Sequence, residues 1–370
     1  MMKQLLIALS LAAVFGATPQ GQAPPPAKSP FQKLAEPWPD AAQMRQRKAD
    51  AEALRLFTAE DPVAFTLTAD FRTINRDRDP KSKKQYPAEL TLAGETKSIP
   101  VKLNARGHVR RMARTCDYVP LKIEFPDDQV AGTHFDGQDG LKLVVQCRNA
   151  GAFEQFLLRE YLVYRVLNLI TPQSFRARLA KVAYIDPAGK LLGERYGMLL
   201  EDDSDVAKRM EGRTVELPRV LFKDIHAETL DTMMLFEYMI GSTDFSIFAL
   251  HNVVFVQKPD RVLYSVPYDF DMAGLVSPPY AIPDKRLPIQ SVKERLYRGP
   301  CRTLEQLESA LAPFRAQKDR VLAVPDTIPD LSKGSANDAK NFLGDFYDSI
   351  KDSKDVKRLL VDGCKQTPTM

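Results

Sequence analysis

The feature that most constrains the fold is a change in the spacing of apolar residues along the first half of the chain. Residues 40–57 predict a mostly exposed helix with Asp40 as its N-cap. From residue 63 to residue 145 stretches of alternating apolar and polar residues follow, which is typical of strands that bury one face. The alternating stretches are 63–71, 88–92, 99–103, 121–125 and 141–145. Residues 153–170 then follow a helical spacing, which stops before Thr171-Pro172 because the residue before a proline disfavours the helical backbone. The sequence therefore predicts an antiparallel sheet followed by one amphipathic helix.

The second half of the chain has mostly helical patterns. One more hairpin is predicted from the strand-like stretches 181–185 and 195–200. Helical patterns cover 224–240 and most of 291–365. We therefore expect an α+β fold with the two-lobed layout of a protein kinase, with an antiparallel-sheet N-terminal lobe and a mainly helical C-terminal lobe. The lobes are predicted to span residues 40–203 and 204–370.

The first residues predict export. Residues 5–17 form an apolar run (LLIALSLAAVFGA) behind Lys3, which is the pattern of a signal peptide over residues 1–17. This run is shorter than the roughly 20 residues that a membrane-spanning helix needs. Residues 18–39 form a Pro-rich spacer. We expect a mature protein without a membrane span, exported to the periplasm, the cell envelope or the medium.

The cysteines predict two disulfides. The chain has four cysteines, and an even number in an exported protein favours disulfides, here with three possible connectivities. Cys116 and Cys147 each adjoin a predicted strand, whereas Cys301 and Cys364 bracket the helical tail. We therefore favour the pairs Cys116–Cys147 and Cys301–Cys364.

The charge of the chain argues against a nucleic-acid partner. It has 52 Lys+Arg and 48 Asp+Glu, a net charge of +4. The basic residues are interleaved with acidic ones and do not form the basic stripe that a nucleic-acid-binding surface needs. Nucleic acid is therefore not the expected partner.

An ordered set of oxygen-bearing residues predicts the chemistry. Asp244 follows a long predicted helix, Asn252 precedes an apolar strand, and Asp269 and Asp271 follow a second one. The hairpin predicted between the two strands would bring Asn252 and Asp269 together. Phosphoryl transfer needs a carboxylate for the attacking hydroxyl and oxygen ligands for a metal, and oxygen ligands suit Mg²⁺ or Mn²⁺. The alternative is that the same residues are caps and turn residues.

These segments also carry a resemblance to the CotH kinase family, atypical protein kinases known from spore-coat proteins, over roughly residues 60 to 280. The matching stretches are LNARGHVRR (103–111), VPLKIEF (119–125), LLREYLVYRVLNLI (157–170), RYGMLLEDD (195–203), TDFSIFALHN (243–252) and PYDFD (267–271). The resemblance implies transfer of phosphate from ATP to a Ser or Thr hydroxyl of a protein, or to a glycan hydroxyl. It also implies that Lys122 reaches the ATP phosphates and that Glu160 pairs with Lys122.

The predicted roles follow from these observations. Asp244 is the expected catalytic base, Asn252 and Asp269 are the expected metal ligands, and Asp271 is either a second metal ligand or a cap. Lys122 lies on the polar face of its strand, where a cleft lysine or a solvated lysine would lie, and Lys142 is its rival. The segment Arg106-Gly107 could approach a phosphate closely, since glycine has no side chain and arginine offers a fork of donors.

A second function class stays open at this point. A kinase-like module of the cell envelope could keep the cleft for a protein or polysaccharide partner and have no catalytic activity. ATP is expected to be scarce outside the cytoplasm, which favours this alternative.

Overall fold

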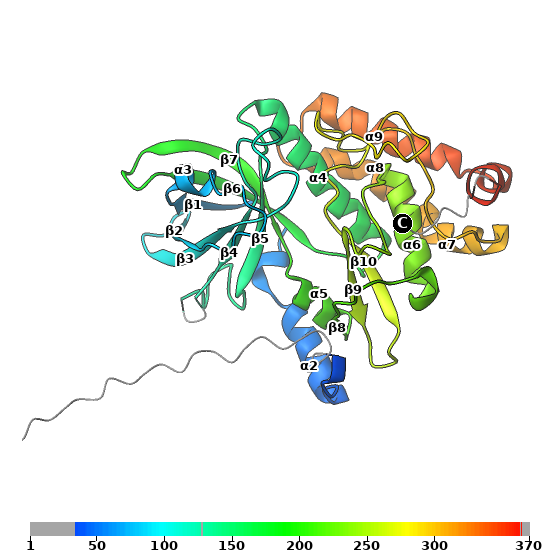
Figure 1. Cartoon of the computed structure of the whole chain (residues 1–370), viewed down its shortest axis with the longest axis horizontal. Coiled ribbons are helices and arrows are strands. Elements are labelled where there is room, and N and C mark those ends of the chain that lie inside the picture. Colours follow the sequence, from blue (N-terminus) through cyan, green and yellow to red (C-terminus); the bar gives the residue numbers. More distant parts are fainter. Residues whose placement is uncertain (1–33, 127–128, 363, 365–370) are drawn as a thin grey trace, which may run out of the picture. The chain divides into compact units, whose positions relative to one another are not determined.

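The computed structural model of the protein describes residues 34–126, 129–362 and 364 (Figure 1). The predicted signal peptide at 1–17 and most of the predicted spacer at 18–39 lie outside the described residues. A helix, α2 (Ala41–Glu52), begins at Asp40, whose carboxylate accepts a hydrogen bond from the backbone N–H of Gln43. Asp40 therefore caps the helix as its position in the sequence predicts.

Seven strands form a closed barrel in the order β1-β2-β3-β4-β5-β7-β6. They are β1 (Val63–Thr68), β2 (Tyr86–Leu92), β3 (Ser98–Ala105), β4 (Leu121–Glu124), β5 (Gly140–Val145), β6 (Ala177–Ile185) and β7 (Leu191–Leu200). The alternating apolar residues of these strands point inward. Phe65, Leu67, Ile123 and Val182, for example, are buried in the barrel core. The strands expected from alternation are therefore present, and their apolar faces are the buried ones.

The expected two-lobed, protein-kinase-like fold with an antiparallel N-terminal sheet is wrong. β1 pairs in parallel with β6, from Val63 opposite Ala180 to Thr68 opposite Ile185, and this pairing closes the sheet into a mixed barrel. The remaining neighbours in the barrel are antiparallel. Alternation shows which face of β1 is buried, but it does not specify the partner strand on its second edge. That partner follows more than a hundred residues later in the chain.

Helices and a small sheet form a second core beside the barrel. The sheet has the order β10-β9-β8, with β8 (Arg213–Thr214), β9 (Val253–Gln257) and β10 (Leu263–Pro267). The main helices are α4 (Gly151–Ile170), α6 (Ala227–Ile240), α7 (Leu304–Ala316), α8 (Lys318–Thr327) and α9 (Lys333–Ser349). The shorter segments are α3 (Phe71–Ile74), α5 (Asp203–Arg209), α10 (Ser353–Val356), η1 (Arg55–Phe57), η2 (Phe222–Asp224) and η3 (Lys357–Val361).

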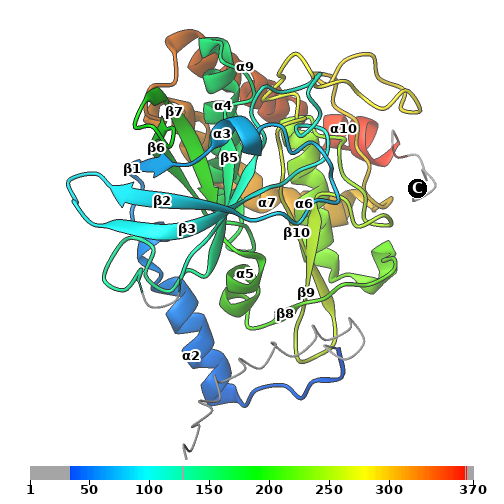
Figure 2. The ribbon, with the colours of Figure 1, turned by 60° about the vertical axis from the view of Figure 1, so that its left-hand side comes forward.

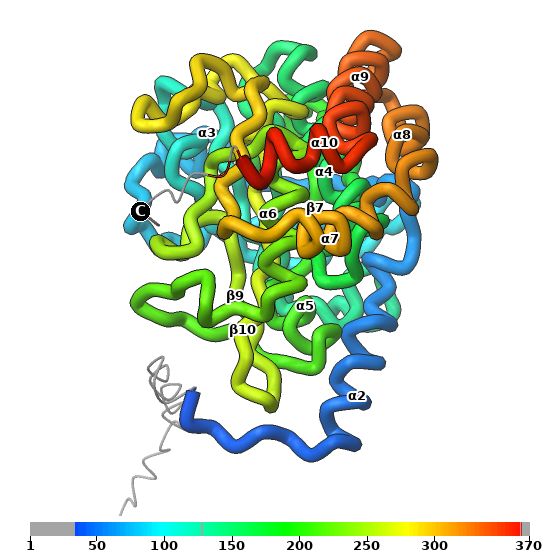
Figure 3. Tube along the Cα trace, turned by 90° about the vertical axis from the view of Figure 1, so that its right-hand side faces the viewer, coloured from blue at the N-terminus to red at the C-terminus, as the bar shows by residue number. Residues whose placement is uncertain are grey.

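The hairpin of β9 and β10 lies beside α6 (Figure 2). Seen from the side away from the barrel, α7 to α10 lie in front of these elements (Figure 3). The antiparallel pairing of β9 with β10, Val253 opposite Pro267, confirms the predicted hairpin. The pairing places the residue before β9 next to the residues after β10.

Both predicted disulfides are present, Cys116–Cys147 and Cys301–Cys364. Two disulfides fit a protein that folds in an oxidising compartment, as exported proteins do. Among the described residues, no helix combines the length and the apolar character that crossing a membrane requires.

Candidate functional site

The predicted acidic residues meet where α6 and the β9–β10 hairpin end. Gly241 stops α6 in a left-handed conformation with φ 67°, and a side chain there would come within 2.9 Å of the Phe342 ring. The chain then turns toward Asp244. Arg298 holds this turn, because its guanidinium donates to the backbone carbonyls of Thr243 and Phe245 at 2.6 and 2.9 Å.

Asn252 joins Asp244 to the segment around Asp269. Its side-chain N–H donates to the backbone carbonyl of Asp244 at 2.6 Å and to the Asp244 carboxylate at 3.2 Å. Its backbone carbonyl accepts from the N–H of Tyr268 at 3.1 Å. The structure thus brings Asp244, Asn252 and Asp269 together, as the hairpin predicts. The amide nitrogen of Asn252 faces Asp244, which leaves its side-chain oxygen as the atom that could bind a metal.

Two of these residues have a left-handed backbone. The φ angles are 55° at Asn252 and 64° at Asp269. Asn and Asp tolerate this conformation better than other side chains, but it is uncommon and is found often at functional sites. The backbone N–H of Asp269 donates to the hydroxyl of Tyr164 on α4 at 3.0 Å. Asp269 is therefore held in place both by α4 and by its position just after β10.

His251, the residue before Asn252, also belongs to the site. Its Nε2 lies 3.3 Å from the Asp244 carboxylate. This hydrogen bond raises the pKa of His251, and burial opposes the rise. Asp244 and His251 line a pocket of about 430 Å³ together with Phe245, Met272 and Arg298. The Asp244 side chain is 42% exposed, so a molecule in this pocket can reach it.

A second, buried group of charges lies behind these residues, around Arg110. The guanidinium of Arg110 lies 3.7 Å from the Glu160 carboxylate and 4.0 Å from the Asp271 carboxylate. It also donates to the backbone carbonyl of Val145. The hydroxyl of Tyr280 donates to Asp271 at 3.0 Å. No sequence pattern indicated a role for Tyr280. Arg110 lies in the stretch 103–111 that carries the family resemblance, but the sequence did not distinguish it from the neighbouring Arg111.

Burial dominates the titration of this group. It raises the pKa of Glu160 well above its usual range, and the neighbouring Asp271 carboxylate adds to the rise. Burial and then the Asp269 charge raise the pKa of Asp271 to about 7, against the opposing effect of Arg110. The cluster of Arg110, Glu160 and Asp271 thus holds more carboxylates than cations, and Arg110 is its central cation.

The expected pair of Lys122 and Glu160 does not form. Lys122 lies 3.7 Å from Glu124 and its side chain is 44% exposed, whereas Glu160 pairs with Arg110. The rival lysine, Lys142, contacts Asp203 at 2.5 Å and lies 5.1 Å from the ring centre of Tyr268, the residue before Asp269. Of the two lysines, Lys142 is thus the one with a contact to the acidic segment.

Arg106, the residue directly after β3, acts on the cluster through its positive charge. Burial raises the pKa of Glu160, and the Arg106 charge opposes that rise. Gly107 follows it with φ 85°, in the left-handed region that favours glycine. The Arg106 guanidinium makes no hydrogen bond or ion pair with any described residue, and the same holds for the Asp269 carboxylate. One cation and one anion of the site therefore have free binding capacity.

The donor set suits a hard cation. The free carboxylate of Asp269 and the side-chain oxygen of Asn252 are oxygen ligands of the kind that Mg²⁺ or Mn²⁺ prefers. Asp271 is less available, because it already accepts from Tyr280 and lies beside Arg110. In the described part of the chain no three His, Cys, Asp or Glu side chains are grouped as a metal site. A Mg²⁺ ion bound by Asp269 and Asn252 would keep water or phosphate as its other ligands, as Mg²⁺ commonly does.

Comparison with known proteins adds no identification. No protein-family model matches the chain, and no significantly similar curated protein is found. The functional argument therefore depends on the residues of the site.

The buried carboxyl of Glu237, on the helix that leads to the site, makes the stability of the protein depend on pH. This carboxyl is buried in α6, and one of its oxygens has no hydrogen-bond partner. Burial, with a smaller contribution from Asp244, raises its pKa to about 8 from 4.5. The folded state thus binds an extra proton between these values, so the wild-type protein loses stability as pH rises from 4.5 to 8.

We expect Glu237→Gln to remove this loss, because glutamine stays neutral. The free energy of unfolding of the variant relative to wild type should rise with pH by up to about 1.4 kcal/mol per unit. Urea unfolding at pH 5, 7 and 8.5 measures the difference. Glu228→Gln, an exposed change on the same helix, is the control and should follow wild type. Parallel pH profiles for Glu237→Gln and wild type would refute the prediction.

Proposed function

We propose that the protein transfers phosphate from ATP to a hydroxyl group with the help of Mg²⁺ or Mn²⁺. The observation that carries the proposal is the meeting of Asp244, Asn252 and Asp269. The charge of Arg106 acts on Tyr268, the residue before Asp269, and on Glu160. These are the groups that phosphoryl transfer requires: a carboxylate for the attacking hydroxyl, oxygen ligands for the metal, and a cation for the phosphates. The proposal rests on this site and is independent of any kinase-like fold.

Each residue has a stated role in the reaction. The metal, when bound by Asn252 and Asp269, supplies charge that stabilises the phosphates. Arg106 contacts the phosphate oxygens as a fork of donors, with Gly107 allowing close approach. Asp244 orients the attacking hydroxyl and takes its proton as the oxygen bonds to the γ-phosphorus. The bond from this phosphorus to the β–γ bridging oxygen breaks, and ADP leaves.

The acceptor is proposed to enter the pocket beside Asp244. The lining combines apolar side chains such as Phe245 and Met272 with charged ones such as Arg286 and Arg298. A Ser or Thr hydroxyl of a protein fits this chemistry, and so does a glycan hydroxyl. We propose the CotH kinase family as the relative that this site resembles, and the periplasm, cell envelope or medium as the place of action.

Incubation of the purified protein with labelled ATP and either Mg²⁺ or Mn²⁺ tests the proposal. We expect metal-dependent phosphate transfer, read as autophosphorylation or as labelling of a protein or glycan acceptor. Asp269→Asn should lower it about a hundredfold or more, a loss comparable to that caused by removing one group that stabilises transition-state charge. Asparagine tolerates the left-handed backbone at this position, so the variant should fold.

The control for this experiment is Asp348→Asn, the same chemical change at an exposed position of α9. It should transfer phosphate at the wild-type rate. Nucleotide binding is measured in parallel by calorimetry with and without the metal. Neither transfer nor metal-dependent binding of ATP by the wild-type protein would contradict the proposal.

A second candidate function is a binding module of the cell envelope without catalytic activity. The observation that favours it is the engagement of Glu160 by Arg110, since this glutamate then holds no lysine toward a nucleotide. In that case the pocket beside Asp244 would bind a protein or polysaccharide. The same labelling experiment separates the two candidates, because the binding module would show no transfer.

A further inference from the structure

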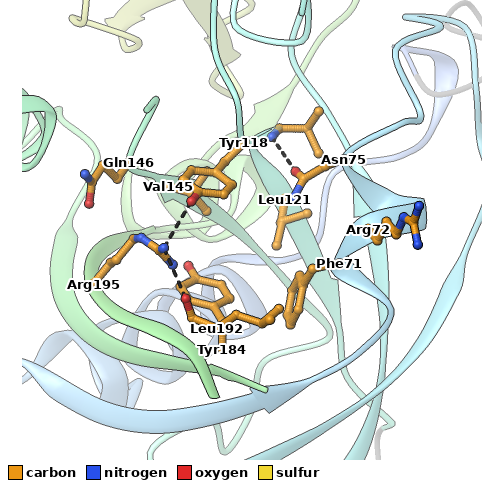
Figure 4. Close-up of a pocket in the computed structure, with 11 residues that line it drawn as sticks. Phe71, Arg72, Asn75, Tyr118, Leu121, Val145, Gln146, Tyr184, Leu192 and Arg195 are labelled. Atoms are coloured by element: carbon orange, nitrogen blue, oxygen red, sulfur yellow. Dashed lines mark hydrogen bonds between the residues drawn. The ribbon is translucent and has the colours of Figure 1, made fainter. Parts of the chain in front are cut away.

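A separate cavity opens at one end of the barrel, where β1 and β6 end and β4 and β7 begin. Its volume is about 310 Å³. The lining is mainly apolar and comes from Phe71, Leu121, Val145, Tyr184 and Leu192. Figure 4 shows these side chains around the cavity. An apolar cavity of this size with a few polar groups is the usual form of a small-molecule site.

Two arginines line this cavity, and Arg195 on β7 is the one whose guanidinium bonds to other lining residues. Its guanidinium donates to the Tyr118 hydroxyl at 3.0 Å, to the Asn149 side-chain oxygen at 2.8 Å and to the Leu192 carbonyl at 3.4 Å. It also lies 4.7 Å from the centre of the Tyr118 ring. All of these partners are neutral. No Asp or Glu among the described residues forms an ion pair with Arg195, so its charge is available to an anionic ligand.

The polar atoms of the other lining residues are mostly engaged within the protein. The Asn75 side-chain oxygen accepts from the N–H of Val119, and the Gln146 side chain donates to two backbone carbonyls. Arg72 also borders the cavity, but Figure 4 shows its guanidinium extending away from the other lining side chains. The cavity thus offers apolar walls and a single positive charge at one side.

We propose that this cavity binds a small aromatic carboxylate. The rings would pack against Phe71, Leu121 and Tyr184, and the carboxylate would bind the guanidinium of Arg195, whose fork of donors matches it. A cavity of about 150 Å³ holds one benzene ring, so a volume of about 310 Å³ has room for one or two rings with the acid group. This proposal is independent of the phosphotransfer proposed above.

Titration with 2-naphthoate and with its neutral analogue 2-naphthamide tests the proposal. Calorimetry at pH 7.5 should show saturable binding of both, with naphthoate the tighter ligand. Arg195→Gln should weaken naphthoate binding by about tenfold to a hundredfold, the range for loss of a hydrogen bond to a charged group. It should leave naphthamide binding nearly unchanged. Arg76→Gln is the matched control, because Arg76 is an exposed arginine of the same segment outside the cavity lining; it should bind both ligands as wild type does.

A second variant keeps the test informative if Arg195→Gln fails to fold. Leu192 is 42% exposed at the rim of the cavity, so Leu192→Glu should fold normally. Its negative charge should weaken naphthoate binding more than naphthamide binding. Melting curves report folding for each variant. Absence of saturable naphthoate binding at millimolar concentrations, or equal naphthoate affinity in wild type and both variants, would overturn the proposal.

Discussion

Arg110→Met should lower the free energy of unfolding by about 3 to 5 kcal/mol at pH 7.5, the usual effect of removing one partner from a buried ion pair. Methionine fills much of the same space but leaves Glu160 and Asp271 as buried carboxylates without their cation. Their mutual repulsion, with that of Asp269, then opposes folding. Urea unfolding followed by circular dichroism measures the change.

The pH dependence of this variant provides a sharper test than its stability alone. Without Arg110 the pKa values of both buried carboxyls rise further, so the folded state binds protons that the unfolded state releases. The loss of stability should therefore shrink as pH falls toward 5. Glu160→Gln in the same chain should restore part of the stability at pH 7.5, because it removes one of the unpaired charges.

The matched control is Arg114→Met, an exposed arginine of the same segment. Its effect should stay within about 0.5 kcal/mol, as for most surface substitutions. Equal stability of the Arg110→Met and Arg114→Met proteins at pH 7.5 would show that Arg110 does not hold the cluster together.

The second large effect is expected from the Cys116–Cys147 disulfide. Its cysteines are 31 residues apart in the sequence, and the chain-entropy estimate for a loop of that length is about 3 to 4 kcal/mol of stability. The disulfide also joins the segment that carries Arg110 to the end of β5, beside the carbonyl of Val145 that Arg110 contacts. The Cys116→Ser/Cys147→Ser protein should therefore be less stable, and its Arg110 segment should be less well fixed against β5.

Cys301→Ser/Cys364→Ser is the comparison for this experiment. Its cysteines are 63 residues apart, so the same estimate gives a loss of about 4 kcal/mol. The Cys301→Ser/Cys364→Ser protein should keep naphthoate binding under native conditions. The Cys116→Ser/Cys147→Ser protein should bind naphthoate more weakly, because Tyr118 and Val145 of the cavity lie next to its cysteines in the chain. Calorimetry and urea unfolding without reductant measure the two effects. A loss below about 1 kcal/mol in the Cys116→Ser/Cys147→Ser protein would contradict the prediction.

Much of the candidate site was predictable because it depends on segments close in the sequence. Asn252 and Asp269 flank a hairpin whose two apolar strands and short turn are visible in the chain. Asp244 comes just after the glycine that ends α6. The pairing of Glu160 was not predictable, since Arg110 and Lys122 are both cations near strands of the barrel. Only the path of the chain after β3 decides which of them reaches α4.

The sequence alone determined the local structure of this protein: the buried face of each strand, the cap of α2, the β9–β10 hairpin and the pairs of cysteines. Each of these follows from residue spacing or from neighbours in the chain. The tertiary structure decided that β6 pairs in parallel with β1 and closes a barrel, that Arg110 is the partner of Glu160, and that an apolar cavity with Arg195 lies at the barrel end. These features depend on packing between segments far apart in the sequence. The spacing of residues within one segment shows which face is buried but does not specify the distant segment that packs against it.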